Sequence, residues 1–144
     1  MSEHFFNLAS LICFYVKWTD AMYSSLGFPR CGGLDRKGSF YRYNHVIYYS
    51  GNERGGSHGV AFIVNKSLNK CVLGYNPVSD RIITIRLQVI PVNVSVVQVY
   101  APTSTASDED MEGFYNQLQD VLDSLPKTDF TLVVGTSMPK LVVV

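Results

Sequence analysis

The chain has 144 residues, of which 47% are hydrophobic and 17% charged, and its twelve basic and twelve acidic residues give a formal charge of zero. This length is enough for one domain with a core, and the composition excludes a disordered or highly charged chain. A neutral balance gives no overall attraction to a nucleic-acid backbone, which weakens any DNA-binding prediction made from charge. The three cysteines and three histidines lack metal-ligand spacing, so neither a zinc site nor a disulfide framework is expected.

An apolar segment covers residues 5–16 near the N-terminus. It is shorter than a membrane span, is interrupted by Asn7 and Ser10, and follows Glu3 and His4 where a signal peptide has Lys or Arg. We therefore expect a core segment, with a cleaved or anchoring signal as the alternative. The protein is expected to be soluble and intracellular, nuclear or cytoplasmic, with no membrane partner.

The chain divides into an irregular first part and a regular second part. Glycines, a proline and scattered charges interrupt residues 27–42, so residues 1–42 are interpreted as a divergent leader. Aromatic and β-branched residues then predict a strand over 43–49, and short apolar runs predict strands over 60–64 and 71–75. A glycine-rich turn over 52–59 separates the first two strands, and residues 65–69 are expected to form another turn.

The next two predicted strands form a hairpin. Apolar residues alternate with polar ones over 83–88, which is the period of a half-buried strand, and residues 94–100 return after Pro91 and Asn93. A further apolar run over 130–134, which ends at Gly135, is typical of a buried strand.

Residues 107–125 predict one amphipathic helix. Ser107 and Asp110 form a weak capping box, and Pro126 ends the helix. Apolar residues recur at steps of three and four on one face: Met111, Phe114, Tyr115, Leu118, Val121, Leu122 and Leu125. Strands, a covering helix and an inner strand together predict the α/β class with a mixed sheet.

Five segments resemble, in their order, the endonuclease/exonuclease/phosphatase family. They are residues 59–64, 80–87 and 97–103, the helix from Asp108, and residues 130–135. The resemblance is strongest to the endonuclease domain of non-LTR retrotransposon reverse transcriptases, a group that includes animal proteins labelled craniofacial development protein 2-like. It covers residues 43–135, so these are interpreted as a partial domain of this family and residues 136–144 as a tail outside it.

The resemblance implies a two-sheet α/β sandwich that hydrolyses phosphodiester bonds in DNA with Mg²⁺. In this family an early Asn and a Glu help to hold the metal, an Asp and an Asn follow the glycine equivalent to Gly135, and a C-terminal Asp-His pair completes the site. Carboxylates suit Mg²⁺ because it is a hard cation, and the metal offsets the charge that develops on the leaving oxygen.

This chain departs from the family pattern at the metal positions. Tyr15 stands where the Glu is expected, and Thr136 and Met138 stand where the Asp and Asn are expected. Tyr100, in the Tyr-Ala-Pro motif, is the functional residue that remains, and a lone tyrosine supplies neither a metal ligand set nor a general base. The sequence therefore predicts a truncated, retrotransposon-derived and catalytically inactive domain, in which no metal site is expected and Mg²⁺ binds poorly.

Two alternatives remain open. One is an active metal-dependent phosphodiesterase with substitute ligands such as Asp80 or Asp108, and the other is a non-catalytic binding module. Arg54 and His58, in the glycine-rich turn, are candidate contacts to a nucleic-acid backbone, against an ordinary turn. Because the chain is expected to supply little more than one sheet, an uncovered sheet face is expected to favour self-association or a protein partner and to leave stability marginal.

Overall fold

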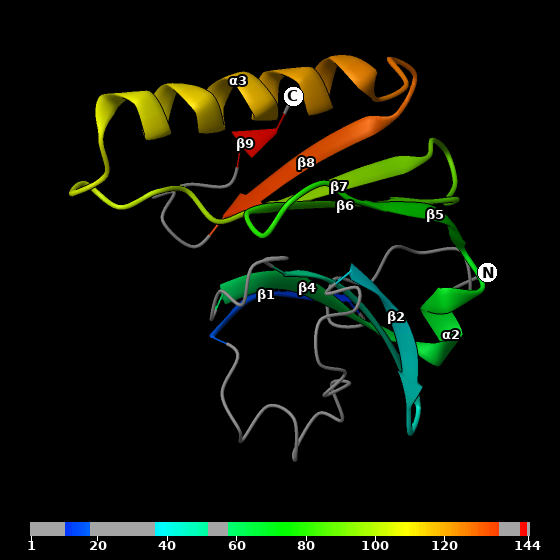
Figure 1. The fold of residues 1–144 in the computed structure, drawn as a ribbon. Coiled ribbons are helices and arrows are strands. Elements are labelled where there is room, and N and C mark those ends of the chain that lie inside the picture. Colours follow the sequence, from blue (N-terminus) through cyan, green and yellow to red (C-terminus); the bar gives the residue numbers. More distant parts are fainter. Residues whose placement is uncertain (1–10, 18–36, 52–57, 136–141, 144) are drawn as a thin grey trace.

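The protein is a two-layer sandwich of β-sheets with one long helix on its outer side (Figure 1). The computed structural model describes residues 11–17, 37–51, 58–135 and 142–143; for residues 11–17, 58, 142 and 143 the description is of the backbone. Two sheets and a covering helix confirm the predicted α/β sandwich.

The first sheet has four antiparallel strands in the order β1-β4-β3-β2. These strands are β1 (Leu11–Lys17), β2 (Lys37–Arg42), β3 (His45–Gly51) and β4 (His58–Asn65). The single strand predicted over 43–49 is wrong in its start, because Tyr43 and Asn44 form the turn between β2 and β3 and Tyr43 has a φ of 54°. The turn could not be predicted, because it lies within a run of aromatic residues that is typical of a strand. Part of the predicted leader, β1 and β2, therefore belongs to the sheet.

The second sheet has five strands in the order β5-β6-β7-β8-β9. These strands are β5 (Val72–Pro77), β6 (Ile82–Leu87), β7 (Val94–Val99), β8 (Phe130–Gly135) and β9 (Val142–Val143). The predicted β6–β7 hairpin is antiparallel, and β7 and β8 run parallel, so the sheet is mixed as expected. Strand β9 lies within the predicted tail and pairs with β8.

Within the described ranges, two helices connect the strands. Helix α3 (Asp108–Ser124) links the parallel strands β7 and β8 and begins as predicted, because the Ser107 hydroxyl accepts a hydrogen bond from the Asp110 amide at 3.1 Å. Its buried residues, Phe114, Leu118 and Val121, pack on the outer face of the second sheet. The turn expected over 65–69 is instead one helical turn, α2 (Lys66–Asn69), because the Asn65 side chain caps it.

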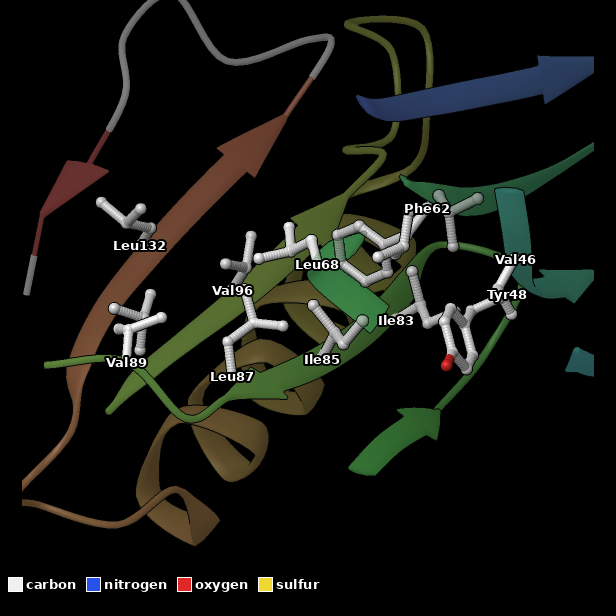
Figure 2. Close-up of a cluster of buried hydrophobic side chains, with 13 residues drawn as sticks. Val46, Tyr48, Phe62, Leu68, Ile83, Ile85, Leu87, Val89, Val96 and Leu132 are labelled. Atoms are coloured by element: carbon white, nitrogen blue, oxygen red, sulfur yellow. The ribbon is translucent and has the colours of Figure 1, made fainter. Parts of the chain in front are cut away.

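The main core lies between the two sheets (Figure 2). Its residues alternate along the strands and come from both layers: Val46, Tyr48, Val60, Phe62, Val64, Leu68, Ile83, Ile85, Leu87, Val89, Val94, Val96 and Leu132. Phe62 and Ile83 are 0% exposed. The sequence predicts that this chain supplies little more than one sheet and leaves the inner face of that sheet uncovered. This expectation is wrong, because the first sheet, β1 to β4, covers the inner face of the second sheet.

A second core lies between α3 and the five-stranded sheet. It contains Ile82, Val97, Val99, Ala101 and Val133 from the sheet side, together with the buried face of α3. Strand β6 is therefore covered on both faces, and the prediction of a half-buried strand is wrong. Thr84 occupies a position predicted to face solvent, and it is 5% exposed.

An ion pair fixes the end of the second sheet where β7 and β8 begin. Arg86 donates two hydrogen bonds to Asp129, from Nε at 2.5 Å and from Nη2 at 3.0 Å, and Ser95 donates a third at 2.8 Å. The Asp129 side chain is 1% exposed, whereas that of Arg86 is 36% exposed. The hydrogen bond from Arg86, helped by the one from Ser95, lowers the pKa of Asp129 below its usual value.

We expect Phe62→Ala to lower the free energy of unfolding by about 3–5 kcal/mol, because it opens a cavity between the two sheets. Leu73→Ala, at a side chain that is 47% exposed, is the matched control and should change it by less than about 0.5 kcal/mol. Urea denaturation measures both. Equal small losses would contradict the inter-sheet core.

We expect Asp129→Asn to lower the free energy of unfolding by about 1–3 kcal/mol at neutral pH, because it removes charged hydrogen bonds from a buried site. Since the folded-state pKa of Asp129 is lowered, its ionisation stabilises the fold above the usual value of 3.8, and this contribution is lost as the pH falls through the folded-state pKa. The difference between parent and variant should therefore narrow below pH 3.8. A difference independent of pH between 7 and 2 would contradict this account.

Candidate functional site

One end of the first sheet collects the strand ends that carry predicted site residues. Lys17, the last residue of β1, pairs with His58, the first residue of β4. Gly51, at the end of β3, pairs with Gly59. Because these pairs are adjacent in the register, the ends of β1 and β3 and the start of β4 lie together.

The second sheet has a matching end. Ile82, at the start of β6, pairs with Val99 at the end of β7, and Val99 pairs with Gly135 at the end of β8. The β5–β6 turn, Tyr100 and Gly135 therefore meet at this end, where the arrowhead of β8 and the β5–β6 turn lie in Figure 1.

A hydrogen bond joins these two ends. The Ser50 hydroxyl, which is fully buried, donates to the carbonyl of Ser79 in the β5–β6 turn at 2.6 Å. On the neighbouring edge strand, the Lys37 ammonium lies 3.4 Å from the Val78 carbonyl, which it can bind as a donor. The ends of both sheets therefore form one surface, which we call the strand-end edge.

Tyr100 is held at this edge by Arg81. The Tyr100 amide donates to the Arg81 carbonyl at 2.8 Å, and Arg81 Nη1 donates to the Tyr100 carbonyl at 3.1 Å. The Arg81 guanidinium lies over the Tyr100 ring, 5.0 Å from its centroid. A cation is thus fixed against Tyr100, the tyrosine that the sequence predicts as a site residue.

A cavity of about 310 Å³ opens beside Arg81, between the β5–β6 turn and α3. Its lining is Ser79, Asp80, Arg81, Pro102, Ala106, Asp110, Gly113, Phe114 and Gln117. The Ser79 hydroxyl accepts a hydrogen bond from the Arg81 amide at 3.1 Å, which fixes the turn at the cavity rim. Two carboxylates and one guanidinium therefore share this cavity.

The described residues do not fit a dedicated Mg²⁺ site. Among them, no three His, Cys, Asp or Glu side chains are grouped so that they could hold a metal ion. Asp80, predicted as a substitute ligand, lines the cavity together with Asp110. Asp108, the other predicted substitute, is exposed at the first residue of α3 and is not part of the cavity lining.

The structure describes the backbone position of some of the other predicted site residues, and the rest lie outside the described residues. His58 is not in the glycine-rich turn but begins β4, at the strand-end edge. Tyr15 lies in β1 opposite Val60, two residues before the strand ends. Arg54, Thr136 and Met138 lie outside the described residues.

Sequence reasoning missed the residues that organise this edge. Arg81 was noted only as part of a family segment, and Ser50 was not singled out. Gln98 was also missed: it is 1% exposed, on the inter-sheet face of β7, and its Oε1 has no hydrogen-bond partner. A signal for Gln98 was available, since a glutamine next to the valines of a predicted buried strand requires a hydrogen-bond partner.

The sequence is similar to two curated relatives. It is 41% identical over 92 residues to craniofacial development protein 2 of Bos taurus, and 40% identical over 92 residues to that of Tragulus javanicus. Each match covers 64% of this chain but only 16% of the relative, so the chain spans a small part of the curated proteins it matches. No protein-family model matches the chain.

The fold is similar to that of TDP2 from Caenorhabditis elegans. The crystal structure of selenomethionine TDP2 matches with a TM-score of 0.54 and 11% identity, over 88% of this chain and 36% of that one. A truncated TDP2 matches with a TM-score of 0.53 and 12% identity, over 88% of this chain and 48% of that one. At these identities the likeness concerns the fold alone: this chain has the two-sheet α/β sandwich of TDP2.

Proposed function

We propose that this chain is a domain of the endonuclease/exonuclease/phosphatase family, derived from a retrotransposon endonuclease, that does not hydrolyse DNA itself. The observation that carries the proposal is the strand-end edge. This edge brings together the strand ends on which the family builds its site, and it retains Tyr100. The positions where the family has metal ligands hold Tyr15, Thr136 and Met138.

The chemistry of these replacements supports inactivity. A tyrosine, a threonine and a methionine do not provide the anionic oxygens that Mg²⁺ prefers. Tyr100 can orient a phosphate through its hydroxyl, and Arg81 beside it can attract one, but neither supplies the carboxylate oxygens that Mg²⁺ prefers. The edge is thus suited to contact a phosphodiester rather than to cleave it. DNA is the partner that the family resemblance implies.

A second candidate function rests on the cavity. Asp80 and Asp110 line it together, and Mg²⁺ is often held by one or two carboxylates with the rest of its shell supplied by water and substrate. An active phosphodiesterase that uses this pair is therefore the alternative. It differs from the proposal in a measurable way, because its activity would depend on both aspartates.

We expect the purified chain to leave supercoiled plasmid intact in the presence of Mg²⁺ or Mn²⁺. Loss of one transition-state donor alone lowers an enzymatic rate by about 10²–10³, and here several family ligands are replaced. Agarose-gel electrophoresis measures nicking, and circular dichroism on the same sample establishes that the protein is folded.

The controls are Tyr100→Phe, Asp80→Asn and Asp110→Asn. Metal-dependent nicking by the parent that falls in Tyr100→Phe would overturn the proposal and show an active site of family type. Nicking that falls in both aspartate variants would establish the cavity as the metal site. Nicking that is equal in all four proteins comes from a contaminating nuclease and would leave the expected inactivity standing.

A further inference from the structure

The total charge is zero, but basic and acidic residues are distributed unevenly between the described part of the first sheet and helix α3. Residues 37–51 and 58–79, which form most of the first sheet together with α2 and β5, contain four Lys or Arg and no Asp or Glu. Helix α3, on the opposite side of the second sheet, has six Asp or Glu and no Lys or Arg. Figure 1 shows the first sheet and α3 on opposite sides of the second sheet, of which β5 is an edge strand. The charges of these two described parts therefore favour the approach of an anionic partner from the side of the first sheet rather than from the side of α3.

Aromatic and basic side chains gather at one corner of the first sheet. They are the exposed Tyr41, Tyr43, Lys66 and Lys70 and the half-buried Arg42, which we call the hairpin-tip patch. Tyr43 is 85% exposed and Tyr41 is 74% exposed. The Arg42 guanidinium lies 4.8 Å from the centroid of the Tyr43 ring.

Backbone contacts bring the two halves of the patch together. Arg42 pairs with His45 across the β2–β3 turn, and the Lys66 amide donates to the Asn44 carbonyl in that turn at 2.8 Å. Helix α2 therefore begins beside the hairpin. The patch lies at the opposite end of the first sheet from Gly51, so it is separate from the strand-end edge.

The patch also has a rigid base. The Tyr48 hydroxyl donates to Asn69 at 2.5 Å, and the Tyr48 and Tyr75 rings are 4.7 Å apart. Burial, with smaller contributions from neighbouring Tyr41 and Tyr75, raises the pKa of the Tyr48 phenol. Tyr41 therefore lies beside a buried tyrosine that is fixed to α2.

Tyr43 occupies a backbone conformation that disfavours its side chain. Its φ of 54° lies in the left-handed region, which asparagine and glycine adopt more readily than an aromatic residue. An exposed tyrosine there contributes little burial to the fold. Unfavourable residues of this kind are concentrated at functional sites.

We infer that the hairpin-tip patch binds single-stranded nucleic acid. The rings of Tyr41 and Tyr43 offer faces on which unpaired bases stack, while Arg42, Lys66 and Lys70 neutralise the phosphates. A single strand fits better than a duplex, because only its bases are free to stack on exposed rings. The lack of acidic side chains in the described residues 37–51 and 58–79 is the feature that favours a polyanion over a protein partner.

The test is fluorescence anisotropy of a labelled single-stranded oligonucleotide with the full chain. Tyr43→Asn suits the left-handed turn and removes the ring, so it should weaken binding by about 5- to 100-fold without lowering thermal stability. Tyr43→Phe keeps the ring and should retain the affinity. Tyr115→Asn is the matched control, because this tyrosine is 51% exposed on acidic α3, and it should leave binding unchanged.

A charge series gives an independent measurement. Lys66→Ala should make the slope of log K against log salt shallower by about 0.7, the value for one phosphate contact on a single strand. Lys127→Ala, at an exposed lysine between α3 and β8, should leave the slope unchanged.

Three results would overturn the inference. One is equal affinity of Tyr43→Asn, Tyr115→Asn and the parent for the oligonucleotide. Another is tighter binding of a duplex of the same sequence than of the single strand. The third is a parent chain that does not bind the oligonucleotide and is a dimer by analytical ultracentrifugation, while Tyr43→Asn is a monomer. That result would assign the patch to contact with a second copy of the chain. The nicking assay is read separately, so the inference and the proposed function can fail independently.

Discussion

The arrangement of this protein depends on the burial of the inner faces of its two sheets against each other. Both faces are apolar at alternate positions, and a Val, Leu, Ile or Phe side chain buried there contributes about 1.5–3 kcal/mol. This packing sets the relative position of strands that are far apart in sequence. The Ser50–Ser79 hydrogen bond joins the two packed sheets at the strand-end edge. The packing of the core therefore positions the candidate site.

The periodic elements could be predicted from the sequence because their signals are local. Helix α3 has its cap at Ser107 and a regular apolar face, and the β6–β7 hairpin has its turn at Pro91. The first sheet could not be assembled in the same way, since the β2–β3 turn at Tyr43 lacks glycine and interrupts an aromatic run. The pairing of β1 with β4 joins residues that are 41 to 53 positions apart in the sequence, and no local pattern specifies it.

The candidate site could be predicted only in part, because only some of its residues belong to a local sequence motif. Tyr100 was identified through a motif, but its partner Arg81 lies on another strand end and becomes visible only in the pairing of β6 with β7. The Oε1 of Gln98, two residues before Tyr100, is a buried acceptor without a hydrogen-bond partner. Net charge does not describe how charge is distributed, because it averages the acid-free residues 37–51 and 58–79 with an acidic helix. Among the described residues, no helix is long and apolar enough to span a membrane.

The most direct test of this account is whether the two sheets pack together within one chain. Nuclear Overhauser effects between the Phe62 ring and the methyl groups of β6 and β7 measure this contact in solution. The account predicts cross-peaks from Phe62 to Ile83 and Val96, because all three belong to the same core. Cross-peaks from Phe62 confined to its own sheet, with none to either residue of the second sheet, would contradict it.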